Sequence, residues 1–481
     1  MSSPARIRRI KIKVPEEVEI QQVKENNVPQ VPVRVYLETM EWKSEPIPQH
    51  RYSHRPHIRQ GTAGGIHGNM LYLFGGFEDN GQRSNRLVQY NMDTHEWTSI
   101  ECTGKVPPPR YGHACAINGN ELWLFGGQGP EEGLNSKNLF DDLSILDLTS
   151  FEWRRAVVSC VGVNGHVNFV PLARRGHSLL LHDNMLYVYG GSGLDRMYSK
   201  DAYFGDLQRL DLSSFCWYEP TMTGTIPEPR SNHSAVMLPG TNYMIVFGGQ
   251  TARKFVLPPT KKKSPVHNTT AKSVIMESIP PDTGLTTNQV FALDVSTFDW
   301  HIIAPLDGTA PSSRYGHIMQ VHPTNSLCLF MFGGIAYQGY NDGAIHCLDL
   351  ELKRWSTIDC IEPIPPRIRH VFNIHNYQMM IFGGCGENGL CIGDVYTVKI
   401  PNVPPPKCLE LFSHPPKTQK EDEVSLHPTA PPSPRPHTIG GFMGIKSLQI
   451  GTESIQNTVR ISPIKLSRPT TCEKDWCSIG L

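Results

Sequence analysis

The sequence has no long hydrophobic run. Its strongest apolar stretch, residues 327–332, is six residues long, whereas a helix that crosses a bilayer needs about 18 or more. The first 13 residues carry five basic side chains but no apolar segment of the kind that secretory signals contain. We therefore expect no membrane association and a location in the cytoplasm, with the nucleus as an alternative.

The sequence also has no excess of positive or negative charge. With 45 basic and 45 acidic residues the net charge is zero, so the whole chain offers no electrostatic footprint for nucleic acid. The 12 cysteines are scattered without a CxxC pair or a Cys/His cluster at zinc spacing, which indicates reduced thiols and no metal site. Charged residues make up only 19% of the chain, against a usual share of about 25%, which disfavours helical and coiled-coil proteins.

Glycine and proline, in contrast, are abundant. The 42 glycines and 40 prolines predict many turns and few long helices. Six segments share one pattern. In each, an apolar tetrad ends in an aromatic residue and is followed by Gly-Gly. The copies lie at residues 71–76, 122–127, 186–191, 244–249, 329–334 and 379–384. Recurrence of one signature along the chain predicts a repeat architecture.

Two further signatures accompany these tetrads. An Arg-x-Gly-His motif or a variant of it stands about 14 residues before each Gly-Gly pair. It begins at Arg59, Arg110, Arg174, Arg230, Arg314 and Arg367. An alternating apolar-polar segment that ends in tryptophan follows five of the six pairs, at Trp97, Trp153, Trp217, Trp300 and Trp355.

With these three signatures, residues 31–412 resemble the kelch-repeat β-propeller family. The resemblance implies an all-β, six-bladed kelch propeller in a stand-alone kelch-domain-containing protein. The chemistry of the tetrads agrees, because a continuously apolar strand suits a sheet that is covered on both faces, as in stacked blades. Residues 36–42, which end in Trp42, match the end of the first tryptophan segment. We expect them to supply the outermost strand of blade six and so to close the ring.

Three segments fall outside the repeats. Residues 1–30 form a basic and polar arm, residues 250–287 are inserted in repeat four, and residues 413–481 have only two aromatics. Because such segments cannot bury a core, we expect a disordered arm, a mobile loop and a disordered C-terminal tail. Ser264, Ser433 and Ser462 each precede a proline and are candidate phosphorylation sites.

Catalytic signatures are lacking. The sequence shows no nucleophile elbow, P-loop, zinc-protease or dinucleotide pattern in a supporting context, so we expect no enzyme and no cofactor. The recurring histidines, His113, His177, His233, His317 and His370, share one motif position and are expected to be structural. Some kelch propellers are copper oxidases, but the clustered Tyr/His set of that alternative is not recognisable here.

A binding surface is therefore the favoured kind of site. In kelch propellers the residue after the motif arginine commonly faces the mouth of the central channel, which implies a rim of Gln60, Tyr111, Arg175, Ser231, Tyr315 and Ile368. The six motif arginines are either structural or part of this rim. A mixed polar and aromatic rim suits an extended peptide segment, and Arg175 has the fork geometry that binds a carboxylate or phosphate.

Two functions compete. The first is a monomeric adaptor or scaffold whose propeller binds a protein partner. The second is a substrate receptor of a cullin-RING ubiquitin ligase that recognises a short degron, with residues 404–413 at the place where related receptors dock elongin. His414 and the two prolines after it would end a helix that begins in that segment. Gln250 stands where a carboxylate-binding arginine is expected.

Overall fold

The computed structural model describes residues 44–46, 59–131, 138–158, 170–195, 201–251, 285–305, 310–336, 339–340, 343–358, 360, 363–400 and 405–406. All of them belong to the first of two compact units, Met1–Leu411. The arm, the three candidate phosphorylation sites and the tail from residue 413 lie outside the described residues. Among the described residues no helix is long and apolar enough to cross a membrane.

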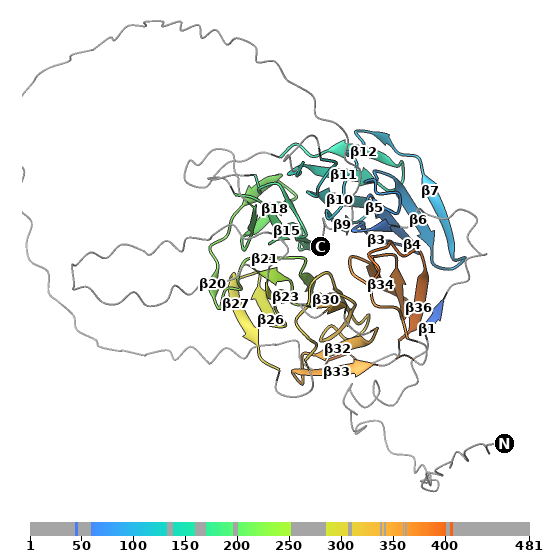
Figure 1. The fold of residues 1–481 in the computed structure, drawn as a ribbon. Coiled ribbons are helices and arrows are strands. Elements are labelled where there is room, and N and C mark those ends of the chain that lie inside the picture. Colours follow the sequence, from blue (N-terminus) through green and yellow to red (C-terminus); the bar gives the residue numbers. More distant parts are fainter. Residues whose placement is uncertain are drawn as a thin grey trace, which may run out of the picture. The chain divides into compact units, whose positions relative to one another are not determined.

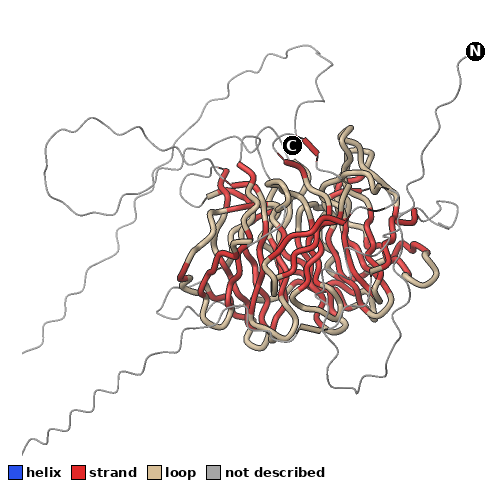
Figure 2. Tube along the Cα trace, turned by 90° about the horizontal axis from the view of Figure 1, so that it is seen from below, coloured by secondary structure: helices blue, strands red, loops and turns tan. Residues whose placement is uncertain are grey.

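The described strands form six sheets of four or five strands each, which surround a common axis as the blades of a propeller (Figure 1). Viewed from the side, these strands and the turns between them make up the described part of the chain (Figure 2). The prediction of an all-β kelch propeller is thereby confirmed.

Each blade is an antiparallel meander whose first strand lies nearest the axis. Blade 1 contains β3 (Ala63–His67), β4 (Met70–Phe74), β6 (Leu87–Asn91) and β7 (Glu96–Ile100), and blade 2 contains β9 (Ala114–Asn118), β10 (Glu121–Phe125), β11 (Leu143–Asp147) and β12 (Glu152–Arg155) with β8 (Thr103–Gly104). Blade 3 contains β14 (Ser178–His182), β15 (Met185–Tyr189), β18 (Leu207–Asp211) and β19 (Cys216–Tyr218).

The other three blades repeat this order. Blade 4 contains β22 (Ser234–Met237), β23 (Tyr243–Phe247), β26 (Val290–Asp294) and β27 (Asp299–Ile303) with β20 (Thr223–Gly224). Blade 5 contains β28 (Ile318–Val321), β29 (Cys328–Phe332), β32 (Ile345–Asp349) and β33 (Arg354–Ile358). Blade 6 contains β34 (Val371–His375), β35 (Gln378–Phe382) and β36 (Val395–Lys399), and its outermost strand is β1 (Ser44–Pro46).

The tetrads and the tryptophans build the contacts between blades. Each tetrad forms the second strand of its blade and is buried, as in β10, where Phe125 has no exposed surface. Trp217 of the next blade packs on Phe125 with the ring centroids 5.7 Å apart. Trp97 of blade 1 packs in the same way on Phe382 of blade 6, at 4.5 Å. These aromatic contacts join neighbouring blades, and the last of them joins the two ends of the ring.

The strand near the N-terminus completes blade 6. β1 runs antiparallel to β36, with Ser44 opposite Val398. In blade 1 the equivalent place, opposite Tyr90, is taken by Trp97, so the register puts a serine there in blade 6. Trp42, expected in this strand, lies outside the described residues.

Removal of residues 31–46 is expected to lower the melting temperature by roughly 5 °C or more, because it exposes the edge of β36 and opens the ring. Removal of residues 1–30, which keeps β1 in place, is the matched control and should leave the melting temperature unchanged. Circular dichroism on both truncations measures the difference. Equal melting temperatures for the two truncations would show that β1 does not close the ring.

The ends of the insertion in repeat four are ordered strands. β24 (Gln250–Thr251) pairs with β25 (Leu285–Thr286), and both extend β21 (Arg230–Ser231) into a three-stranded sheet. Residues 252–284 lie outside the described residues. The boundaries expected for the mobile loop, 250 and 287, therefore include four residues that belong to the sheet.

Candidate functional site

A closed circuit of backbone hydrogen bonds surrounds the axis. The third residue of each Arg-x-Gly-His motif donates its N–H to the carbonyl of the equivalent residue in the preceding blade, at 2.8–3.0 Å. The six members, called the central ring below, are Gly61, Gly112, Gly176, Asn232, Gly316 and Arg369. All six have a positive φ, from 53° to 70°, which explains why the motif favours glycine at this position.

The six motif arginines are structural. All are 0–1% exposed, and each donates from Nη1 to the carbonyl of the first glycine in its own Gly-Gly pair, at 2.9–3.2 Å. In blades 2 and 3, Asp142 and Asp206 form bidentate ion pairs with Arg110 and Arg174, and Asp394 does the same in blade 6. Buried guanidinium groups with these partners hold the Gly-Gly turns and do not face a ligand.

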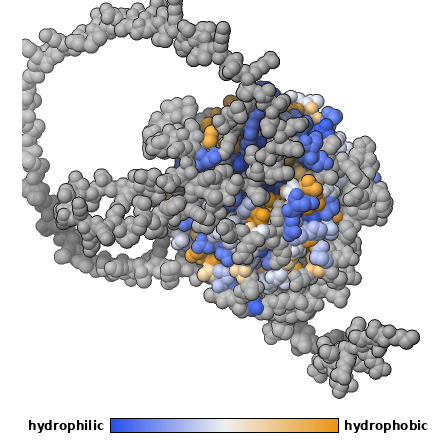
Figure 3. Space-filling model, in the orientation of Figure 1, coloured by the Kyte–Doolittle hydropathy of each residue, from blue (hydrophilic) through white to orange (hydrophobic). Residues whose placement is uncertain are grey.

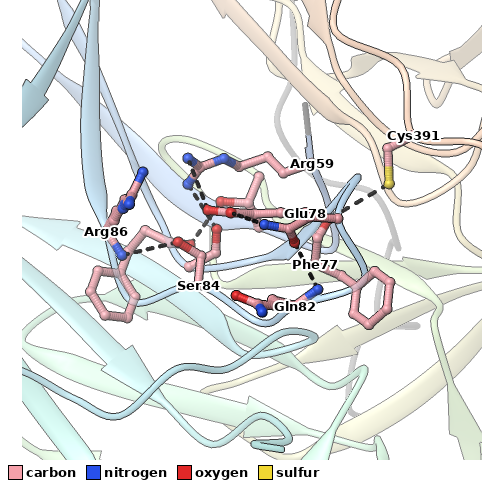
Figure 4. A network of polar contacts seen from close by, with 11 residues as sticks. Arg59, Phe77, Glu78, Gln82, Ser84, Arg86 and Cys391 are labelled. Atoms are coloured by element: carbon pink, nitrogen blue, oxygen red, sulfur yellow. Dashed lines mark hydrogen bonds and ion pairs between the residues drawn. The ribbon is translucent and has the colours of Figure 1, made fainter. Parts of the chain in front are cut away.

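In blade 1 the carboxylate beside the motif arginine comes from a glutamate in another part of the blade. Glu78 lies in β5 (Phe77–Glu78), which pairs with β2 (Arg59–Gln60), and its carboxylate is 4.0 Å from the Arg59 guanidinium. Burial lowers the pKa of Arg59 to about 10, and the charge of Glu78 opposes this shift. Figure 4 shows this network and the Cys391 thiol of blade 6, which donates to the Phe77 carbonyl at 3.7 Å.

The recurring histidines are buried between blades. Each packs edge-on against the aromatic residue that ends the preceding tetrad, as His113 does on Phe74, with the ring centroids 5.8 Å apart and the planes at 76°. Burial and the neighbouring motif arginine lower the pKa of His113, His233 and His370 to about 3. The pKa of His177 and of His317 is also far below its ordinary value, for the same reasons. These imidazoles are neutral packing groups.

The rim residues pair with a second set that sequence reasoning did not single out. The residue after each motif arginine bridges the residue after the Gly-Gly pair of its own blade. The pairs are Gln60 with Phe77, Tyr111 with Gln128, Arg175 with Ser192, Ser231 with Gln250, Tyr315 with Ile335, and Ile368 with Cys385. We call these twelve residues the rim. In the sequence, the residues of the second set could have been identified by their position directly after each Gly-Gly pair.

The six rim residues that follow a motif arginine differ in accessibility between blades 1–3, called the exposed half, and blades 4–6, called the buried half. In blades 1–3, Gln60, Tyr111 and Arg175 are partly exposed. In blades 4–6, Ser231, Tyr315 and Ile368 are buried, with 0%, 8% and 1% of their surface exposed. Partner binding by the exposed half stays a prediction, whereas the buried residues are expected to support the fold. Figure 3 shows that hydrophilic and apolar residues lie side by side on the described surface of this face.

The exposed half is a connected group of aromatic and cationic side chains. Arg175 donates a hydrogen bond to the Tyr111 hydroxyl, which in turn donates to Gln128 Oε1 at 3.1 Å. The guanidinium of Arg83 lies 5.3 Å from the centre of the Tyr111 ring and 5.6 Å from that of Phe77. Cation–π contacts and the hydrogen bond thus fix two arginines around one tyrosine.

The part of the buried half in blades 5 and 6 is mainly apolar. Tyr315, Ile335, Ile368 and Cys385 form one cluster in blades 5 and 6, each at most 8% exposed. In blade 4, which also belongs to the buried half, Asn232 donates from Nδ2 to Gln250 Oε1 at 3.2 Å. Gln250 is thus engaged within the rim.

No group of three or more His, Cys, Asp or Glu side chains capable of holding a metal ion occurs in the part of the chain that the structure describes. Two arginines of the exposed half, Arg83 and Arg175, have aromatic neighbours. Such a surface binds by hydrogen bonds, ion pairs and stacking.

The comparisons with known proteins agree with the fold. The family model described as the KLHDC2/KLHL20/DRC7 Kelch-repeats domain matches residues 23–249 and 278–437. A solved structure titled "Structure of YjhT" has a TM-score of 0.50 and 17% sequence identity, and the match covers 73% of this chain and 99% of that one. At this identity the likeness concerns the fold alone.

Similar sequences include proteins of different size. The chain is 28% identical to acyl-CoA-binding domain-containing protein 4 of Arabidopsis thaliana, over 63% of this chain and 38% of that protein. It is 27% identical to human host cell factor 1, over 76% of this chain but only 17% of that protein. It is 23% identical to Kelch domain-containing protein 2 of Bos taurus, over 69% of this chain and 77% of that protein. The first two matches span well under half of the relatives' own length.

A family model matches most of the chain. The sequence contains six arginine motifs, six Gly-Gly tetrads and five tryptophan segments, and the six-bladed fold places them at equivalent positions. The chain belongs to the family of the KLHDC2/KLHL20/DRC7 Kelch-repeats domain.

Proposed function

We propose that this protein is a non-catalytic adaptor whose propeller binds a segment of a protein partner at the exposed half of the rim. The observation that carries the proposal is the group of Tyr111, Arg175 and Arg83, in which two cations flank one accessible aromatic ring. Tyrosine and arginine are the residue types that contribute most binding energy in protein interfaces.

The connections between strands support this choice of face. The turns between β3 and β4 and between β6 and β7, on the opposite face, span only residues 68–69 and 92–95. The connections that follow the Gly-Gly pairs are longer, for example residues 126–142 in blade 2 and 190–206 in blade 3. Long surface connections on a rigid scaffold are where binding residues concentrate.

Arg175→Ala is expected to abolish or strongly weaken capture of the partner and to change the melting temperature by only a few degrees. Its guanidinium binds a partly exposed tyrosine hydroxyl and no carboxylate within the described residues, so truncation removes little packing. Affinity purification with quantitative mass spectrometry compares the wild type with this variant. The matched control is Arg154→Ala, an arginine that is half exposed on β12 and paired with Glu121.

Proteins that are lost with Arg175→Ala and kept with Arg154→Ala would be the partners of the rim. If the two variants capture the same proteins as the wild type, the exposed half of the rim is not the binding site. A large fall in melting temperature for Arg175→Ala would instead assign Arg175 to the fold.

The ligase-receptor alternative makes a different prediction about the same purification. It requires elongin and cullin among the captured proteins, bound through residues 404–413, of which the structure describes only Pro405 and Pro406. Recovery of both in the wild type and in Arg175→Ala would favour the receptor, because the docking segment lies outside the rim. Their absence from a purification with an intact propeller would favour the adaptor.

A further inference from the structure

The central ring contains one arginine in a position suited to glycine. Arg369 has a φ of +53°, and its backbone both donates to Gly316 and accepts from Gly61. Four of the other five members are glycines, and the fifth is asparagine, which tolerates this conformation better than other residues with a side chain. An arginine here destabilises the native backbone, and strained positions of this kind cluster at functional sites.

The direction of the Arg369 side chain follows from its equivalents in other blades. A Cβ placed on Gly61 would lie 3.4 Å from Tyr111, one on Gly112 would lie 3.4 Å from Arg175, and one on Gly316 would lie 3.3 Å from Ile368. At each position the Cβ thus faces the rim residue of the next blade. By the same geometry the Arg369 side chain begins beside Gln60, the rim residue of blade 1.

Among the residues that the structure describes, no bond explains the Arg369 side chain. Arg367, two residues earlier, is fully buried and forms a bidentate ion pair with Asp394. Arg369 is only partly buried, and within the described residues its guanidinium makes no hydrogen bond or ion pair. Within the described residues, the guanidinium of Arg369 is therefore available for a ligand.

Arg369 extends the cationic half of the rim into blade 6. Around the axis, the side chains of Arg369, Gln60, Tyr111 and Arg175 come from blades 6, 1, 2 and 3 in turn. Arg83 stands between the Phe77 and Tyr111 rings. Its nearest carboxylate, that of Glu131, is 3.8 Å away and 62% exposed, and Glu78 is already used by Arg59. Arg83 and Arg175 thus flank Tyr111, and the side chain of Arg369 begins beside the neighbouring Gln60, so the three arginines come from adjacent positions of the rim.

We infer that Arg369, with Arg83 and Arg175, binds the carboxylate side chains of an acidic segment in the protein partner. The inference rests on the proposed function and adds the chemistry of the partner and a contact residue that the motif does not mark. Guanidinium groups form paired, charge-assisted hydrogen bonds with carboxylates. This contact accounts for an arginine at a backbone position where glycine is more stable.

Arg369→Gly is expected to have two opposite effects in the full-length protein. The melting temperature should rise by about 2 °C, because glycine adopts a positive φ without strain. A displayed library of random peptides, selected on the wild-type protein, should become enriched in Asp and Glu. The selected peptides should bind Arg369→Gly about tenfold more weakly in fluorescence anisotropy. Arg369→Asn, which tolerates the backbone better than most residues, should show the same loss of affinity.

The outcomes separate this inference from the proposed function. If Arg175→Ala loses the selected peptides while Arg369→Gly binds them with wild-type affinity, Arg369 is not a contact residue and the rim still binds the partner. If neither variant changes the affinity, or the library selects no peptide, the proposed function itself fails. Selected peptides without added Asp or Glu, or a lower melting temperature for Arg369→Gly, would also overturn the inference. Arg154→Ala is the matched surface control and should retain full affinity.

Discussion

Lowering the pH from about 7.5 to about 5.5 is expected to destabilise the propeller by several kcal/mol, because five buried histidines lie between its blades. Each is neutral in the native state and has a pKa far below its ordinary value, at about 3 for His113, His233 and His370. A histidine in the unfolded chain titrates near 6.5. Acid therefore protonates the unfolded chain and not the native state.

The direction of this effect follows from proton linkage. Above about pH 6.5 neither state binds protons at these sites, so the stability is fully present. As the pH falls below that value, each unfolded histidine binds one proton that its folded counterpart cannot accept. Every such site then lowers the free energy of unfolding by about 1.4 kcal/mol per pH unit, down to the folded pKa. Five sites together exceed the usual margin of stability within a few pH units.

Thermal melts at a series of pH values measure this effect. Blade 1 offers the natural comparison, since Thr62 stands where the other blades have histidine and donates to the Phe74 carbonyl at 2.7 Å. His113→Thr should therefore make the stability less steeply dependent on pH by about one proton. A melting temperature that does not change between about pH 7.5 and about pH 5.5 would show that the histidines are not buried as neutral groups.

Arg174→Ala is expected to lower the free energy of unfolding by about 3–5 kcal/mol. The side chain is fully buried and donates to Leu172 O at 2.9 Å, to Gly190 O at 2.9 Å and to both oxygens of Asp206 at 2.8 Å. Its removal leaves the Asp206 carboxylate without its cation and the Gly190 turn without its donor. Urea denaturation gives the change in free energy.

Arg154→Ala is the control for charge without burial. Its ion pair with Glu121 is short, at 2.6 Å, but the arginine side chain is 50% exposed. Exposed pairs contribute about 0–1 kcal/mol, because water screens them in both states. Similar losses for the two variants would mean that the arginines of the motif act as surface charges and do not hold the Gly-Gly turns.

The sequence predicted the ring because its signatures lie on the periodic part of the fold. The tetrads and the Gly-Gly pairs recur because each blade contains a strand that is covered on both faces. The tryptophans recur in five blades because each packs on an aromatic residue of the neighbouring blade. The position of Arg369 was not predictable in this way. A residue that breaks a repeat shows its significance only when the backbone conformation at the repeat position is known.

The sequence alone determined the all-β kelch propeller, the number of its repeats and the place of the rim along the chain, because these depend on local patterns that recur in each blade. The tertiary structure alone decided which rim residues are accessible, with Tyr111 and Arg175 partly exposed and Ser231 and Ile368 buried. It also placed Arg83 on Tyr111 and showed the motif arginines bound within their blades. Burial and pairing arise from residues far apart in the chain, so no local pattern contains them.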